Sequence, residues 1–291
     1  MEIKLSAPSF SNRLSAPLWT ANSILRARAR QHAVKDFAGP LSIKSVQRGI
    51  VDWKTGQQTL RVYENSFLVL NSNEPYTLEI DSREPVETCC VFFQNGWIES
   101  LFGSLTHADD VEGANTRSLT FISRLHTRDE RVLPRMEMLS KQTEADPLWL
   151  DEQFLGMAQH LLLLFRDAQR QIRRCPAARA ATRVELFRRV CRGREYLHAH
   201  VADKVTLVSC ARAACLSPYH FQRTFQATFG RSPHAYLTEL RLERAAHLLR
   251  TSNTSVTDIS SAVGFESPTS FAALFRRRFG ASPSAVKGCE I

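Results

Sequence analysis

The chain carries one hydrophobic pattern twice, fifty residues apart. In each copy phenylalanine recurs at every fourth position, and residues 217–237 align without a gap with residues 267–287. The two stretches read SPYHFQRTFQATFGRSPHAYL and SPTSFAALFRRRFGASPSAVK. They are identical at nine of 21 positions: Ser217/Ser267, Pro218/Pro268, Phe221/Phe271, Phe225/Phe275, Phe229/Phe279, Gly230/Gly280, Ser232/Ser282, Pro233/Pro283 and Ala235/Ala285. Apolar residues four apart share one helix face, so the repeat predicts one helical unit used twice.

Each copy contains signals for where its helix begins and ends. Ser-Pro supplies an N-cap and a proline at the first helical position, and a glycine follows the last phenylalanine. A shorter helical pattern precedes each copy, LVSCARAAC (207–215) and VTDISSAVGF (256–265). Two short helices joined by a tight turn predict a helix-turn-helix in each copy, with the second helix in the major groove of DNA.

The two predicted turns differ in sequence. The first has Ala214-Cys215 where the second has Gly264-Phe265. Glycine is the residue that most easily adopts a left-handed backbone. We therefore expect the left-handed turn residue to be missing from the first turn.

A single capped helix from Ser232 to Thr251 is predicted between the copies. About 20 residues at ~1.5 Å each give a rod of roughly 30 Å. Successive major grooves on one face of B-DNA lie ~34 Å apart, so this helix could set two recognition helices into adjacent grooves without a dimer. Paired helical hairpins also build solenoids, and two copies alone do not decide between these alternatives.

The front half has a different period. Residues 41–97 alternate short β-like runs with turn residues, which predicts a small antiparallel barrel or sandwich. Its aromatic residues could line a ligand cavity or simply fill the core. Residues 41–106 contain no histidine, so we expect no metal in this domain. We assign residues 1–128 to it and predict an α+β protein with an all-α C-terminal part.

From residue 129 to 175 the pattern is helical. Its apolar residues follow 4-3 spacing, which is typical of a heptad stripe: Leu150, Phe154, Met157, Leu161, Leu164 and Ala168. The stripe predicts either a dimer contact or packing within the chain, and we assign residues 129–175 to a helical dimerisation region. The stretch RRCPAARAAT (173–182), with its helix-breaking Pro176, is the expected linker to a DNA-binding domain over residues 183–291.

The charge is located in that last domain. Residues 183–291 hold 16 Lys and Arg against 8 Asp and Glu, a net +8; residues 1–182 hold 22 against 21, a net +1; together they give the +9 of the chain. Clustered basic residues indicate a nucleic-acid partner. No apolar run reaches the ~18 residues of a membrane span, and the seven cysteines form no Cys-x-x-Cys pair. We expect a cytoplasmic protein without membrane contact, metal or cofactor.

The stretch VTDISSAVGFESPTSFAALFRRRFGASPSAVK (256–287) resembles the signature of the AraC/XylS family of transcription regulators. The stretch LSPYHFQRTFQATFGRSPHAYLTELRLERAAHLL (216–249) resembles the first half of the same module, and the resemblance covers residues 183–287. It implies a sequence-specific regulator that activates or represses transcription, with a cupin-like effector barrel in front. It also implies promoter DNA and RNA polymerase as partners, and leaves a small-molecule effector and a homodimer possible.

The phenylalanine stripe fixes which side chains can read DNA, because it must face the core. The expected base contacts are Tyr219, Gln222 and Arg223 on the first helix and Thr269, Ala272 and Ala273 on the second. Arg276, Arg277 and Arg278 are expected on phosphates, with Arg241, Arg244 and Lys287 as weaker candidates. The main alternative is a cupin-type enzyme with a basic tail. Such enzymes need a His-x-His motif, which the front half lacks, so we expect no enzymatic activity.

Overall fold

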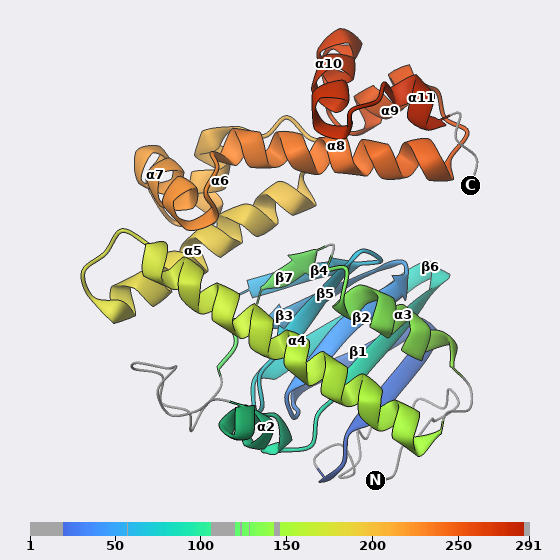
Figure 1. The fold of residues 1–291 in the computed structure, drawn as a ribbon, viewed down its shortest axis with the longest axis vertical. Coiled ribbons are helices and arrows are strands. Elements are labelled where there is room, and N and C mark those ends of the chain that lie inside the picture. Colours follow the sequence, from blue (N-terminus) through green and yellow to red (C-terminus); the bar gives the residue numbers. More distant parts are fainter. Residues whose placement is uncertain are drawn as a thin grey trace. The chain divides into compact units, whose positions relative to one another are not determined.

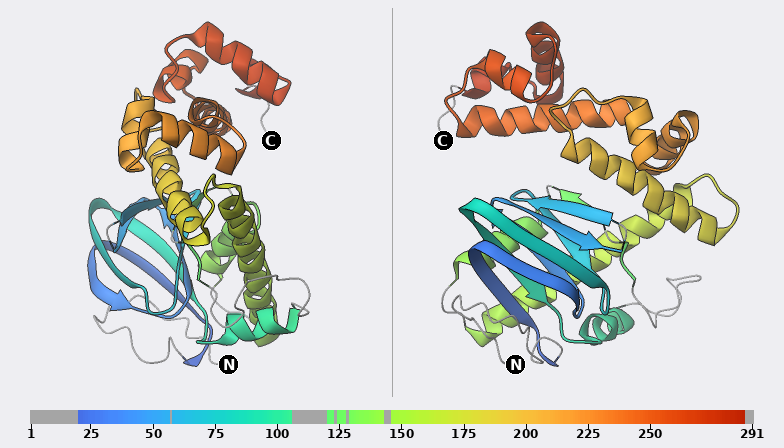
Figure 2. Two further views of the ribbon diagram at one scale, coloured as in Figure 1. Left: turned by 90° about the vertical axis from the view of Figure 1, so that its left-hand side faces the viewer. Right: turned by 180° about the vertical axis from the view of Figure 1, so that it is seen from behind.

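The computed structural model describes residues 20–56, 58–105, 120–122, 124–127, 129–142 and 146–287. The chain divides into two compact units, and the division falls between Gln169 and Arg170. The first unit combines an antiparallel sheet with helices, and the second is entirely helical over its described residues (Figures 1 and 2). The predicted α+β class, with a β-rich front and an all-α C-terminal part, is confirmed.

Seven antiparallel strands curl into a nearly closed barrel (Figure 1). The sheet order is β4-β3-β6-β2-β5-β7, and β1 also pairs with β6. Their bounds are β1 Ser23–Ala38, β2 Ser42–Arg48, β3 Ile50–Thr55, β4 Gln58–Tyr63, β5 Ser66–Leu70, β6 Pro75–Phe92 and β7 Leu125–Thr127.

The two longest strands hold the barrel together. Strand β6 pairs with β3 through its first half, with β2 through its second half, and with β1 along nearly its whole length. The sequence predicts two strands where β6 is one, because the polar run around Ser82 looks like a turn. It also misses β1, whose residues are mostly half-buried or exposed and so lack a strong apolar alternation.

The sheet buries a different apolar layer on each face. Along β2, Ile43 belongs to a cluster with the helices of the first unit, whereas Val46 belongs to a cluster inside the barrel. Successive residues of a strand point to opposite faces, so β2, which is buried almost throughout, contributes to both layers. The strands of the barrel are therefore the shared wall between two cores.

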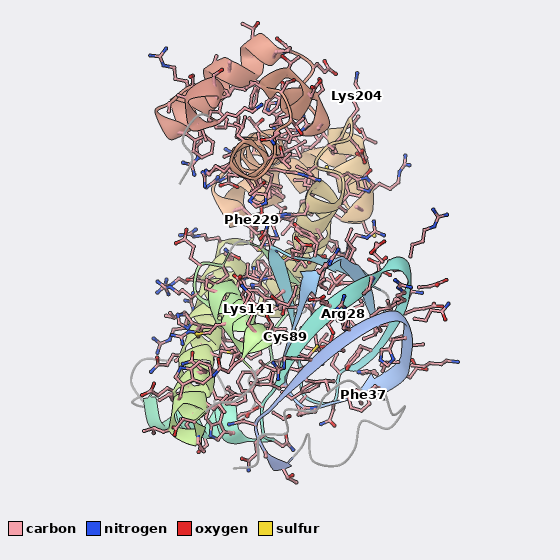
Figure 3. All side chains as sticks on the ribbon, turned by 90° about the vertical axis from the view of Figure 1, so that its right-hand side faces the viewer. Arg28, Phe37, Cys89, Lys141, Lys204 and Phe229 are labelled. Atoms are coloured by element: carbon pink, nitrogen blue, oxygen red, sulfur yellow. The ribbon has the colours of Figure 1, made fainter. Side chains whose placement is uncertain are left out.

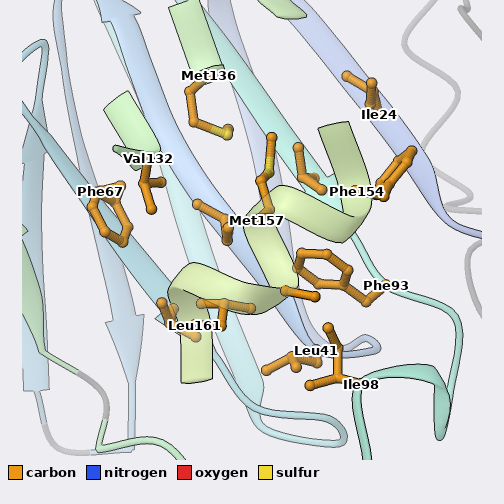
Figure 4. Packing of buried hydrophobic residues seen from close by; sticks show 14 of the residues in the cluster. Ile24, Leu41, Phe67, Phe93, Ile98, Val132, Met136, Phe154, Met157 and Leu161 are labelled. Carbon is orange, nitrogen blue, oxygen red and sulfur yellow. The ribbon is translucent and has the colours of Figure 1, made fainter. Parts of the chain in front are cut away.

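Three helices accompany the barrel, α2 (Trp97–Leu105), α3 (Val132–Lys141) and the long α4 (Pro147–Arg174). The stripe predicted as a dimer contact lies on α4 and faces the sheet. Phe154, Met157 and Leu161 pack against Phe93 and Met136 in the buried cluster (Figure 4). The prediction that this stripe forms a dimer contact is wrong, because its side chains already fill the core of their own chain.

Seven helices form the second unit over its described residues: α5 Ala180–Ala199, α6 Leu207–Ala213, α7 Pro218–Phe229, α8 Pro233–Thr251, α9 Val256–Ala262, α10 Pro268–Phe279 and α11 Pro283–Lys287. Pro176 lies in the break between α4 and α5, where the linker was predicted. The compact unit nevertheless begins at Arg170, inside α4, earlier than the DNA-binding domain assigned from the sequence. Among the described residues, no helix is long and apolar enough to cross a membrane.

The buried stripe of α4 generates a stability prediction. Replacing Leu161, which is fully buried, with Ala should lower the free energy of unfolding of the first unit by ~2–5 kcal/mol, because the lost side chain leaves a cavity. Leu163→Ala is the matched control, since Leu163 is 41% exposed on the same helix, and it should change stability by less than ~1 kcal/mol. Urea unfolding followed by tryptophan fluorescence measures both. Equal effects would contradict the assignment of Leu161 to the core.

Candidate DNA interface

The first recognition helix, α7, is fixed at both ends by its own sequence. The Ser217 side chain caps the helix by accepting from the amide of His220 at 3.3 Å, and Pro218 occupies the first turn. At the other end Gly230 adopts a left-handed conformation with φ 74°. The second recognition helix, α10, repeats this arrangement with Ser267 as N-cap and Gly280 at φ 76°.

Buried phenylalanines set the rotation of each recognition helix. Phe221 and Phe225 on α7 are fully buried, with ring centroids 5.4 Å apart, and the equivalent rings on α10 are 5.5 Å apart. The α5 backbone comes close to α7 at Gly193, where an added Cβ would lie 2.3 Å from the Phe221 ring. Neither helix can rotate about its axis without exposing an aromatic ring.

The opposite faces carry the residues predicted to contact bases. Tyr219 is 76% exposed, and Gln222 and Arg223 are exposed beside it at the i+3 and i+4 positions. On α10, Thr269 and Ala273 are exposed and Ala272 is half-buried. The structure thus brings each set of three together on one outward face of its helix. Their contact with bases stays a prediction.

The two turns are built alike, contrary to the expectation from the sequence. Cys215 adopts a left-handed backbone with φ 52°, and Gly264 does so with φ 92°. The amide of Leu216 donates to the carbonyl of Ala211 at 2.9 Å, and the second turn contains the equivalent bond. The left-handed residue is therefore present in the first turn. The sequence alignment missed it because the second turn is one residue longer, so that Gly264 corresponds to Cys215 and not to Ala214.

The predicted phosphate contacts divide into free and engaged side chains. Arg276 and Arg277 are exposed on α10, as is Arg244 on α8. Arg278 forms ion pairs with carboxylates of α8, and Lys287 donates to the carbonyls of residues 253 and 254 at 3.1 and 2.7 Å. These internal contacts make Arg278 and Lys287 less available for phosphate.

Arg241 is an internal tie. Its Nε donates to the carbonyl of Val201 at 2.8 Å, and its Nη2 donates to the carbonyl of Asp203 at 2.7 Å. Burial lowers the pKa of its guanidinium from the ordinary value, although Glu266 and Asp203 oppose the shift. Because arginine stays charged in proteins, the buried charge is balanced by these carbonyls. We therefore assign Arg241 to holding the α5–α6 loop against α8.

One carboxylate of α8 joins the ends of both recognition helices. Glu239 accepts from Arg231, which follows α7, and its Oε1 lies 3.1 Å from the Nε of Arg278 in the last turn of α10. Glu243, one turn further along α8, lies 3.7 Å from Arg278. These contacts bring the C-terminal ends of α7 and α10 to the middle of α8.

Sequence reasoning missed Arg231 and Glu239 as an interacting pair. They are eight residues apart, with the end of one helix and the start of another between them, so no i,i+4 spacing connects them. A second omission could have been found. Arg276 lies seven residues after Thr269 and therefore continues the outward face of α10, a position that aligns with Gln226 in the first copy.

Comparison with known proteins decides what this pair of motifs is. The family described as helix-turn-helix domain matches residues 210–288. Over 92 residues the chain is 40% identical to the HTH-type transcriptional activator RhaS from Escherichia coli strain SE11, which covers 32% of this chain and 33% of that protein. The helical unit is an AraC/XylS-type DNA-binding domain. The chain spans about one third of the length of the curated relatives it matches.

Solved structures of AraC-type proteins are similar over the same region. A probable AraC family transcriptional regulator from Rhodopseudomonas palustris CGA009 is 29% identical, with a TM-score of 0.33, and covers 34% of this chain and 94% of that one. The DNA-binding domain of AdpA, in complex with a target DNA, is 30% identical, with a TM-score of 0.33, and covers 34% and 88%.

The turn geometry of this AraC-type domain gives a testable contrast. At Gly264 an added Cβ would lie 2.8 Å from the Ala202 carbonyl and 2.9 Å from the Arg241 guanidinium, whereas at Gly280 nothing lies within 4 Å. Both glycines have positive φ, so both alanine variants cost ~1–2 kcal/mol of backbone strain. Gly264→Ala should cost a further ~1–3 kcal/mol through the clash. Thermal unfolding of the two full-length variants measures the difference, and equal losses would contradict the tight turn.

The Glu239 junction gives a second prediction. Glu239→Gln should release Arg231 and Arg278, which then become available to phosphates, so the salt dependence of DNA binding should steepen by ~0.9 for each new contact. Preference for a specific site over random DNA should fall, because the two recognition helices lose a shared anchor. Fluorescence anisotropy at several salt concentrations measures both quantities.

Glu266→Gln is the control for that measurement. Glu266 pairs with Lys204 at 3.5 Å, and both side chains are largely exposed, with Lys204 extending from the surface of the helical unit (Figure 3). The control changes the net charge by the same amount without touching the recognition helices. If both variants change the salt dependence and the preference equally, Glu239 has no positioning role.

Proposed function

We propose that the protein is a sequence-specific transcription regulator that places α7 and α10 in adjacent major grooves of promoter DNA. The observation that carries this proposal is the repeated helix pair, which presents two equivalent outward faces. Helix α8 connects them with 19 residues, about 28 Å at ~1.5 Å per residue. Adjacent grooves on one face of DNA lie ~34 Å apart, so one chain can reach both.

The two recognition helices should contribute differently to sequence preference. Gln222 can make two hydrogen bonds to adenine and Arg223 two to guanine, each worth ~1–3 kcal/mol of discrimination. Thr269 and the two alanines of α10 offer one hydroxyl and small apolar contacts. We therefore propose that α7 supplies most of the base discrimination, while Arg276 and Arg277 hold α10 on the DNA through phosphates.

The front unit is proposed to sense an effector and to bias the DNA-binding unit. This part rests on the resemblance to the AraC/XylS family and on the antiparallel barrel. A ligand shifts such an equilibrium only if it binds one state of the protein better than another. We propose that the unit is not an enzyme, in line with the absence of histidine from residues 41–106.

The wider setting of the regulator belongs to the same proposal. We infer that it acts in the cytoplasm and contacts RNA polymerase at the promoters that it regulates. A homodimer is compatible with this function. Its contact would have to come from a surface other than the inward stripe of α4, since that stripe is buried in the core.

Substitutions in the two recognition helices test the proposal. Arg223→Ala should relax the preference at one base position by ~1–3 kcal/mol and leave binding to other variants of the site nearly unchanged. Arg277→Ala should weaken binding to all sequences alike and flatten the salt dependence by ~0.9, because a phosphate contact carries no base information. A site selected from random DNA, with its single-base variants, provides the substrates for both measurements.

These two variants control for each other, since each removes one arginine from an exposed position of a recognition helix. A uniform loss over all sequences for Arg223→Ala would remove it from the base contacts. Failure of the wild-type protein to select any sequence from random DNA would overturn the proposed function itself.

A further inference from the structure

A lysine is buried inside the barrel. Lys44 lies in the middle of β2, paired with Leu68 of β5 and Cys90 of β6, and only 1% of its surface is exposed. Its side chain lies on the opposite face of the strand from Ile43, which packs with the helices, and it reaches Tyr76 of the inner cluster. A lysine at such a position is unusual, because lysine is almost never fully buried unless it is paired.

Aromatic groups surround the ammonium. The Nζ donates to the Tyr76 hydroxyl at 3.3 Å, lies 3.7 Å from the centroid of the Phe92 ring and lies 4.8 Å from that of the Tyr76 ring. Among the residues that the structure describes, no carboxylate lies within ion-pair distance of it. The rings stabilise a cation through their quadrupoles, and Tyr76 satisfies one of its three N–H donors.

Burial acts on this ammonium as expected for an incompletely paired charge. It lowers the pKa of Lys44 to about 8, opposed only by the neighbouring Cys90. The ammonium still predominates at pH 7, and it is lost as the pH rises through about 8. A buried charge of this kind accepts an anionic partner readily, because most of its desolvation has already occurred in the folded protein.

A second donor in the same interior is unpaired. Trp53 of β3 is buried in the inner cluster, and its indole Nε1 has no hydrogen-bond partner among the described residues. Buried polar groups in proteins are almost always hydrogen-bonded. The barrel therefore holds two nitrogen donors, one of them charged, and the remainder of the inner cluster is apolar except for the Tyr76 hydroxyl.

We propose that the barrel interior binds a small organic anion, with its carboxylate on the Nζ of Lys44 and its apolar body among the side chains of the inner cluster. Lys44 supplies the charge complement, and Trp53 supplies a neutral donor for an acceptor atom of the ligand. The proposal names the chemical class of the effector, and so rests on the proposed effector-sensing function of the front unit.

The experiment uses full-length protein without DNA. Its thermal unfolding is measured with millimolar hexanoate, cyclohexanecarboxylate and phenylacetate, and with the neutral amide of each acid. At least one carboxylate should raise the midpoint by several degrees at pH 7 through binding to the folded state, and its amide should not. The shift should shrink at pH 9, because Lys44 then loses the proton that attracts the anion.

Two variants locate the site. Lys44→Met keeps the length of the side chain without its charge, and should abolish the response to the carboxylate. Trp53→Phe keeps the aromatic body without the N–H, and should weaken binding by about tenfold, the loss of a single good hydrogen bond. If Lys44→Met does not fold, the pH dependence of the wild type and the Trp53 variant still decide.

The outcomes separate this proposal from the proposed function. No stabilisation by any of the three carboxylates, an equal response to their amides, or an undiminished response in Lys44→Met overturns the anion site. DNA binding of the ligand-free protein is measured separately, so a regulator that lacks the anion site remains distinguishable from a protein that does not select DNA at all.

Discussion

Burial of two phenylalanines, four residues apart, is the constraint on which the DNA-facing surface depends. Phe221 and Phe225 on α7, and Phe271 and Phe275 on α10, are fully buried. Each ring removes a large apolar area from water, so rotating either helix costs several kcal/mol, roughly ~1.5–3 per exposed side chain. The outward face is then determined by what remains. The helix-turn-helix orients its reading side chains through the core, before any contact with DNA is made.

The same domain must also hold its two halves at a constant separation, and here the interactions are polar. Helix α8 packs through its C-terminal half against α9 and α10, while its N-terminal end meets α7 through Tyr236. Glu239 and Arg241 then join groups from both halves. Exposed ion pairs contribute little to stability, so their effect lies in which geometry is favoured more than in how stable the fold is. Apolar burial sets the rotation of each helix, and charge pairing sets the relation between them.

The sequence predicted those features whose signals are local and missed those that depend on distant partners. Caps, glycines and the phenylalanine period act within one helix, so α7, α8 and α10 were located almost to the residue. The stripe on α4 was read correctly as apolar, but periodicity cannot tell an intrachain partner from a second copy. Strand β1 was missed because its stability comes from pairing along β6, which leaves little trace in its own residues. The left-handed Cys215 shows the same limit, since the surrounding hydrogen bonds impose its conformation.

Lys44 shows where pattern reading and chemistry part. In a strand buried on both faces, alternation carries no information, and one lysine among apolar neighbours looks like an exposed position. Only the fold reveals that the ammonium faces the interior, with Tyr76 as its hydrogen-bond partner and rings on its other sides. A core selected for stability alone would favour an apolar side chain there, because even a paired buried charge is often no more stable than its hydrophobic replacement. The presence of the charge therefore calls for a reason outside stability, and an anion that the barrel can hold supplies one.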